Sequence, residues 1–162
     1  MNRKYDSARY YESVTLLREH FDRPGITTDL IVGFPGETEE EFTDTLAFVE
    51  RCAFSSMHIF PYSRRPGTPA AGMSGQIPRA EQEARAGRAG LLAARLEGEY
   101  LAGWVGATLP VLFEEETDGC WRGHAPNYVE VRAPAAENLH NVLGNVVITG
   151  VQDTRLMGVL ES

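Results

Sequence analysis

Two short segments contain the residues whose types and spacing could do chemistry. The first is Gly33-Phe34-Pro35-Gly36-Glu37-Thr38, which stands between an apolar run and an acidic segment. Its two glycines allow a sharp turn and a close approach of the backbone to a ligand. A helix beginning behind it would offer unpaired N–H groups to an anion or a carboxylate. Because the Gly-Lys-Ser/Thr ending of a phosphate loop is missing, the segment predicts either a plain strand-to-helix turn or a turn that binds a ligand other than a nucleoside triphosphate.

The second segment is Tyr62-Ser63-Arg64-Arg65-Pro66-Gly67-Thr68-Pro69, directly after another short apolar run. In α/β folds, ligands bind at the carboxyl ends of the strands. A tyrosine, a serine and two arginines at such a place could contact an anionic or aromatic ligand. The content of proline and glycine equally fits a rigid, solvated linker.

A third segment, Gly123–Arg132, alternates in the manner of a half-buried strand. Val129 and Val131 would face a core, and Tyr128 would share the opposite face with Arg132. An exposed tyrosine near an arginine can stack on an unpaired base. A tyrosine that completes the core is the alternative.

The elements that must position the first two segments follow from the spacing of apolar residues. Residues 6–21 and 39–52 have helical periodicity, and a capping-box sequence at Thr38 begins the second helix. The apolar runs in 26–34 and 57–60 indicate buried parallel strands. This order predicts an α/β layout with too few strands to form a complete sheet.

The second half of the chain has a different character. Residues 63–78 are typical of a linker, and residues 79–103 have the pattern of a long helix. Five short strands then follow within about 55 residues, which favours a small OB-like barrel, an architecture that often binds oligonucleotides. The strands are expected at Leu109–Glu115, Cys120–His124, Tyr128–Arg132, Asn145–Gly150 and Leu156–Leu160.

Composition limits the classes of function. The 162 residues carry a formal charge of -8, and no segment is basic, so any RNA contact must depend on local patches or on stacking. Apolar stretches are shorter than the roughly 20 residues of a membrane span, and we expect a cytoplasmic protein without a membrane partner. The two cysteines, Cys52 and Cys120, are expected to be buried structural thiols rather than a metal knuckle.

These motifs together resemble the radical-SAM tRNA methylthiotransferases. Thr28–Thr38 and Phe60–Ala70 match the family at its own spacing, and Met1–Tyr5 resembles a Met-x-Arg-x-Tyr segment inside its catalytic barrel. Gly123–Val131 and the terminal Leu156–Leu160 are similar to a TRAM domain. The resemblance implies the last part of a radical-SAM (β/α) partial barrel followed by a small all-β TRAM barrel.

Within that family, Met57–Arg65 is most similar to the MtaB branch, which methylthiolates N6-threonylcarbamoyladenosine beside the tRNA anticodon. The MiaB branch acts on isopentenyladenosine, shares the Tyr-Ser-x-Arg-Pro-Gly-Thr pattern and is the alternative. The branch that modifies a ribosomal protein usually lacks Arg-Pro-Gly-Thr and fits less well.

The resemblance also implies domains and site residues. The domains are 1–70 (end of the catalytic barrel), 71–106 (linker and long helix) and 107–162 (TRAM-like β-barrel). The residues expected to contact S-adenosylmethionine are Gly33, Pro35, Gly36, Glu37, Tyr62 and Ser63. The residues expected to contact the tRNA anticodon stem-loop are Arg64, Arg65, Arg122, His124, Asn127, Tyr128 and Arg132.

The family's iron–sulfur chemistry implies that other parts are needed. Its members hold two [4Fe–4S] clusters with a CxxxCxxC motif and three further cysteines, all upstream of the equivalent of Met1. Two distant cysteines cannot supply these ligands, so we expect a C-terminal portion that is inactive without a missing N-terminal part. In the whole enzyme, S-adenosylmethionine would yield a radical that abstracts the adenine C2 hydrogen, before sulfur and a methyl group are added.

Two other classes of function compete with this interpretation. A stand-alone RNA-binding module would use residues 107–162 without catalysis, although the acidic balance would make binding weak. An α/β-hydrolase-like fragment would use the Gly33 turn, but the chain has no Gly-x-Ser-x-Gly elbow for a nucleophile.

Overall fold

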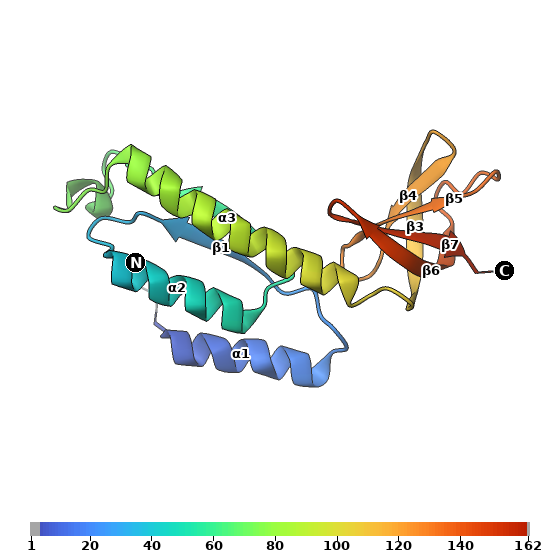
Figure 1. Ribbon diagram of the computed structural model, residues 1–162, viewed down its shortest axis with the longest axis horizontal. Coiled ribbons are helices and arrows are strands. Elements are labelled where there is room, and N and C mark those ends of the chain that lie inside the picture. The colour runs from blue at the N-terminus through green and yellow to red at the C-terminus, as the bar shows by residue number, and fades with distance from the viewer. Residues whose placement is uncertain (1–3, 162) are drawn as a thin grey trace. The chain divides into compact units, whose positions relative to one another are not determined.

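The computed structural model describes residues 4–161, which divide into two units at Leu96 and Glu97 (Figure 1). The elements of the first unit are α1 (Ser7–His20), β1 (Thr27–Val32), α2 (Glu39–Cys52), β2 (Ser56–Pro61), the 3-10 helix η1 (Pro69–Gly72) and most of α3 (Arg79–Ala102). The elements of the second unit, after the end of α3, are β3 (Thr108–Thr117), β4 (Cys120–His124), β5 (Glu130–Pro134), β6 (Leu143–Gln152) and β7 (Arg155–Leu160).

Helices α1 and α2 begin with side-chain caps, and the cap of α2 was predicted from the sequence. The Asp6 side chain accepts a hydrogen bond from the N–H of Arg9 and caps α1. At α2 the capping box is complete, because Thr38 Oγ1 accepts from the N–H of Glu41 while the Glu41 carboxylate accepts from the N–H of Thr38. Within the described part of the chain, no helix is both long enough and apolar enough to cross a membrane.

The first unit is built on a two-stranded parallel sheet. β1 and β2 pair in register from Thr27 opposite Ser56 to Val32 opposite Pro61. Val32 is fully buried in a cluster with Phe42 of α2 and Ala89 of α3. The other face of the sheet is open: Ile31 and Phe60, which are partners in the register, are 38% and 50% exposed.

The second unit is a closed five-stranded barrel in the order β3-β4-β5-β7-β6. Strand residues that alternate along the sequence point inward, and the core includes fully buried Val111, Phe113, Val131, Val146 and Leu156. The chain therefore combines a mixed α/β N-terminal part that has parallel strands with a small all-β barrel, and the expected fold class is confirmed.

One expected strand was wrong at its start. β5 begins at Glu130, and Tyr128 lies before it with φ 63°, in the left-handed region. The N–H of Tyr128 donates to the carbonyl of Ala125, and the N–H of Val129 donates to the Asn127 side chain, so residues 125–128 form a turn. Tyr128 therefore does not share a strand face with Arg132.

The cysteines differ from each other in burial. Cys52 is fully buried at the end of α2, and this burial raises the pKa of its thiol above the ordinary value. Cys120 begins β4 and is only half-buried, because alternate residues of a barrel strand face outward. The expectation of two buried thiols is thus correct for Cys52 alone.

Candidate functional site

The backbone between β1 and α2 makes a tight turn that requires glycine at two places. Gly33 has φ 71° and Gly36 has φ 85°, both in the region that L-residues rarely adopt. The N–H of Glu37 donates to the carbonyl of Phe34, which closes the turn. Gly36 is exposed, and apart from its own residue and its two chain neighbours nothing lies within 4 Å of the place that a Cβ would take there. The turn therefore presents bare backbone at Gly36.

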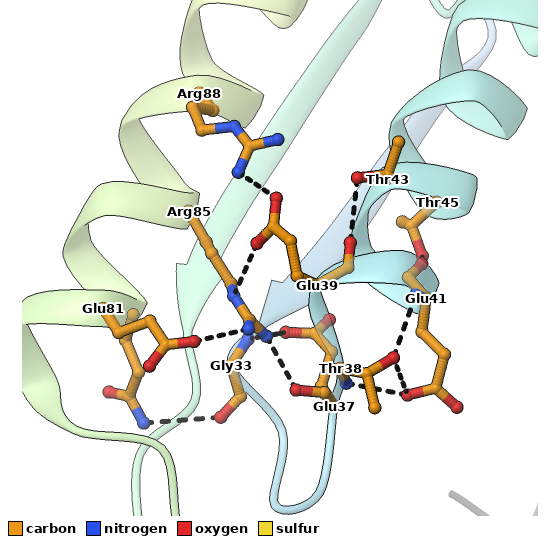
Figure 2. A network of polar contacts seen from close by, with 11 residues as sticks. Gly33, Glu37, Thr38, Glu39, Glu41, Thr43, Thr45, Glu81, Arg85 and Arg88 are labelled. Carbon is orange, nitrogen blue, oxygen red and sulfur yellow. Dashed lines mark hydrogen bonds and ion pairs between the residues drawn. The ribbon is translucent and has the colours of Figure 1, made fainter.

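The carboxylate of Glu37 points into the protein rather than out of the turn (Figure 2). Its Oε2 accepts from the N–H of Gly33 at 2.6 Å and from Nη1 of Arg85 at 2.7 Å. The side chain is only 13% exposed. The side-chain polar group of Glu37, one of the residues expected to bind the cofactor, is thus already occupied by other groups of the protein.

Arg85 of α3 lies at the centre of this polar network (Figure 2). Its side chain is 4% exposed, and Nη2 donates to Glu81 while Nη1 reaches both the carboxylate and the carbonyl of Glu37. Burial alone would lower the pKa of Arg85, but the hydrogen bond and negative charge of Glu37, with the charges of Glu81 and Glu39, raise it above the ordinary value. Arg85 therefore stays charged.

An open pocket of about 540 Å³ lies at the ends of β1 and β2. Ile31, Phe34 and Phe60 supply apolar wall, and the rings of Phe34 and Tyr62 meet edge to face at 5.3 Å. Ser63 also lines this pocket. The structure thus brings Tyr62 and Ser63 beside the turn through Phe34, whereas the turn residues Gly33, Pro35, Gly36 and Glu37 do not line the pocket.

The hydroxyl of Tyr62 is buried and has no hydrogen-bond partner among residues 4–161. Buried hydroxyl groups are normally paired, so an unpaired one beside two pockets is a place where a bound molecule could supply the partner. Tyr62 lines both the 540 Å³ pocket and a smaller one of about 330 Å³ with Arg64 and Gln82.

The two adjacent arginines point to different places. Arg65 lines the larger pocket, and its guanidinium makes no hydrogen bond or ion pair within the described chain. Arg64 lines the smaller pocket, and its Nε donates to the carbonyl of Ala71. Arg65 is therefore the one with its charge available to a ligand.

The polar residues expected to bind RNA in the barrel are already engaged. Arg122 pairs with Glu115, and Arg132 pairs with Glu130 at 3.0 Å. The remaining two contacts are those of His124 with Glu114 and of Asn127 with the hydroxyl of Tyr100. The barrel therefore offers few unpaired positive charges to phosphates.

Tyr128 alone among these residues is fully accessible, with 89% of its surface exposed. It forms one side of a groove of about 490 Å³, together with Leu112, Leu143, Glu114 and His124. Leu143 is 69% exposed. Apolar side chains beside an exposed aromatic ring make a surface on which an unstacked base can lie.

Sequence reasoning missed Arg85 and Gln82 as parts of the candidate site. They lie three residues apart on one face of α3, and they reach Glu37 and Gly33, whose positions in the chain are 48 and 49 residues earlier. The only local signal was the i,i+4 spacing of Glu81 and Arg85, which is common on exposed helices. No group of three or more possible metal ligands occurs within residues 4–161.

Comparisons with known proteins agree with this geometry. Residues 1–49 match the family model of the Radical SAM superfamily. The N-terminal part of the chain therefore belongs to the radical SAM superfamily, and most of the chain is homologous to methylthiotransferases of the MtaB and MiaB kinds. The closed five-stranded barrel is consistent with a TRAM domain.

Three relatives show the extent of the homology. The threonylcarbamoyladenosine tRNA methylthiotransferase MtaB of Bacillus subtilis is 35% identical over 152 residues, which are 91% of this chain and 33% of that protein. The tRNA-2-methylthio-N(6)-dimethylallyladenosine synthase of Acetivibrio thermocellus is 37% identical over 161 residues, which are 98% of this chain and 34% of that protein. The synthase of the same name from Thermobifida fusca is 44% identical over 115 residues, which are 71% of this chain and 23% of that protein. The chain spans about a third or less of the length of these relatives.

Proposed function

We propose that this chain is the C-terminal portion of a tRNA methylthiotransferase that adds a methylthio group at C2 of N6-threonylcarbamoyladenosine next to the anticodon. The class of enzyme is supported by relatives of both branches, which align with 91% and 98% of the chain. The observation that carries the choice of threonylcarbamoyladenosine is the guanidinium of Arg65 in the larger pocket. The residues that hold the iron–sulfur clusters would lie in a further N-terminal part. Domains at 1–70, 71–106 and 107–162 remain part of this proposal.

The residues present fit S-adenosylmethionine, which membership of the superfamily implies together with iron–sulfur chemistry in the full-length enzyme. The exposed, unobstructed backbone of Gly36 allows close approach. The unpaired Tyr62 hydroxyl offers a buried polar partner. Both features lie where ligands bind in α/β folds, at the carboxyl ends of the strands.

The residues of this chain would bind and orient S-adenosylmethionine and the tRNA. Gly33, Pro35, Gly36 and Glu37 would shape the backbone beside the cofactor, and the hydroxyls of Tyr62 and Ser63 would hydrogen-bond to it. When bound, S-adenosylmethionine supplies the radical precursor and the methyl group of the product. The closed barrel, with Tyr128 and its groove, would hold the anticodon stem-loop.

Two features of the larger pocket bear on which adenosine is modified. The threonylcarbamoyl group carries a carboxylate, which the guanidinium of Arg65 could bind, since this guanidinium has no partner among the described residues. A dimethylallyl group is apolar and would suit Ile31 and Phe60 instead. The dimethylallyl substrate is the second candidate, since several relatives at 43–46% identity over about 70% of the chain carry that name.

The substrate can be determined from the modified nucleosides of the source cell. The gene containing this chain is deleted, total tRNA is digested, and the nucleosides are separated by liquid chromatography with mass detection. We expect 2-methylthio-N6-threonylcarbamoyladenosine to disappear and to return when the gene is supplied on a plasmid. Loss of the dimethylallyl product instead would establish the second candidate, and no change in either nucleoside would refute both.

The proposed cofactor contact at Gly36 has a separate test. In the full-length enzyme with reconstituted clusters, Gly36→Val places a branched side chain at a left-handed residue and over the exposed backbone. We expect equilibrium dialysis to detect no binding of S-adenosylmethionine, while a Gly87→Ala control at an exposed position of α3 binds as the wild type does. Retained binding by Gly36→Val would show that the turn is only scaffold.

A further inference from the structure

The turn between β1 and α2 has few backbone contacts of its own. The N–H of Gly36 donates to the carbonyl of Gly75 at 2.8 Å, and the N–H of Glu37 donates to the carbonyl of Phe34. The N–H of Gly33 is satisfied by a side chain, the carboxylate of Glu37. The shape of the turn therefore depends on where that carboxylate is held.

Arg85 holds this carboxylate from the far side. One nitrogen, Nη1, donates to both the carboxylate and the carbonyl of Glu37, at 2.7 and 3.0 Å. The other terminal nitrogen is fixed by Glu81 one helical turn earlier. Arg85 thus contacts both the side chain and the backbone of Glu37 through Nη1, while Glu81 of the same helix fixes the direction of the guanidinium through Nη2.

Stability is a poor explanation for so buried a cation. Removing a guanidinium from water is costly, and well-packed apolar residues often replace buried ion pairs without loss of stability. One side of Arg85 is apolar, because its guanidinium lies over the ring of Phe42 beside the cluster of Val32, Phe42 and Ala89, while the other side faces the carboxylates of Glu37 and Glu81. An apolar residue could pack against Phe42, but it could neither pair with nor orient the carboxylate of Glu37.

We infer that Arg85 is a positioning residue, which sets the shape of the Gly33–Glu37 turn through Glu37 and so determines how tightly the turn binds S-adenosylmethionine. The inference rests on the proposed function for the identity of the ligand. Gln82, on the same face of α3, also helps to hold the turn in place. It packs against Gly33 and donates a long hydrogen bond, 3.4 Å, to the carbonyl of Gly33.

The test compares two arginines of α3 in the full-length enzyme with reconstituted clusters. Arg85→Met removes the guanidinium and its hydrogen bonds but keeps a long, unbranched side chain, and Arg88→Met is the matched control. Arg88 lies one turn along α3, pairs with Glu39 and also lies over the Phe42 ring, but it makes no hydrogen bond to Glu37 and is 46% exposed. Three quantities are measured: the Kd for S-adenosylmethionine, the deuterium uptake of a peptide spanning 33–37, and the melting temperature.

We expect Arg85→Met to raise the Kd roughly tenfold or more, the size of effect typical when a supporting contact behind a ligand shell is lost. Deuterium uptake over residues 33–37 should rise with it, and Arg88→Met should change neither. Arg85→Lys keeps the positive charge on one nitrogen but lacks the planar guanidinium, and it should give an intermediate Kd. If Arg85→Met does not fold, the Lys variant carries the comparison.

Two results would overturn the inference: a wild-type Kd and uptake in Arg85→Met (or in Arg85→Lys if only that variant folds), or an equal rise of the Kd in Arg88→Met. The proposed function fails separately, if the wild-type enzyme itself binds no S-adenosylmethionine. In that case the deuterium uptake of the turn still decides whether Arg85 positions Glu37, because it requires no ligand.

Discussion

Gly33 and Gln82 stand 49 positions apart in the chain, yet a Cβ added at Gly33 would lie only 2.5 Å from Cγ of Gln82. The contact joins the end of β1 to the first turns of α3. Real Cβ atoms do not approach other carbon atoms so closely, and φ at Gly33 is 71°. Glycine at this position is therefore required twice, by the backbone conformation and by the neighbouring helix.

This contact predicts the cost of Gly33→Ala. Strain in the left-handed region and the displacement of Gln82 should together lower the free energy of unfolding by about 2 kcal/mol. Gly87→Ala is the control, because Gly87 is exposed on α3 and a Cβ there would meet nothing within 4 Å beyond its own helix backbone, and it should stabilise by roughly 0.5–1 kcal/mol. Melting of both variants tests this, and an unchanged melting temperature in Gly33→Ala would contradict it.

The exposed ring of Tyr128 should contribute to RNA affinity. A base stacked on it would contribute about 1–3 kcal/mol, so Tyr128→Ala in the full-length enzyme should raise the Kd for an anticodon stem-loop about tenfold. Tyr128→Phe keeps the ring and should bind as the wild type does. Fluorescence anisotropy measures both, and equal affinity of all three proteins would show that Tyr128 does not stack on RNA.

The pairing of the barrel arginines predicts a weak dependence of RNA binding on salt. Arg132 and Arg155 both pair with Glu130, which is 20% exposed. Glu130→Gln removes the charge that neutralises them, and each arginine freed to bind a phosphate should steepen the plot of log K against log salt by roughly 0.7–0.9. Glu137→Gln, at an exposed position, removes a charge without freeing an arginine. Equal slopes for the two variants would contradict the expectation.

The capping box of α2 should make the stability of the protein depend on pH in the acidic range. Hydrogen bonds from the backbone and the hydroxyl of Thr38 lower the pKa of Glu41 below its ordinary value of 4.5. A carboxyl group with a lowered folded pKa stabilises the fold above its unfolded pKa, and this stability is lost as the pH falls through the folded pKa. Glu41→Gln should therefore lower the melting temperature at pH 7 and reduce the further loss between about pH 5 and pH 3.

Glu40→Gln provides the comparison for this measurement. Glu40 is also exposed in the first turn of α2, and it has the same charge near the helix N-terminus without a place in the capping box. If both variants lost the same amount of acid-dependent stability, the effect would come from the helix dipole and not from the hydrogen bonds of Thr38.

Local signals in the sequence predicted the elements well. The capping box at Thr38 and the parallel strands on either side of α2 both follow from residues within a few positions of one another. Strand β4 also has the expected bounds, Cys120–His124. The left-handed turn at Tyr128 was missed, because alternation alone does not reveal that the Asn127 side chain competes for the backbone of Val129.

What the sequence determined by itself was the fold class, the order of the elements and the family, because caps, periodicity and ordered motifs are short-range properties of the chain. Only the tertiary structure decided which charges are free. Arg65 keeps its guanidinium available within the described chain, whereas Arg122 and Arg132 are paired and Glu37 is held by Arg85. The pair of Arg85 and Glu37 joins residues 48 positions apart. The energies of all three pairs depend on burial and on distances in space, which no local pattern contains.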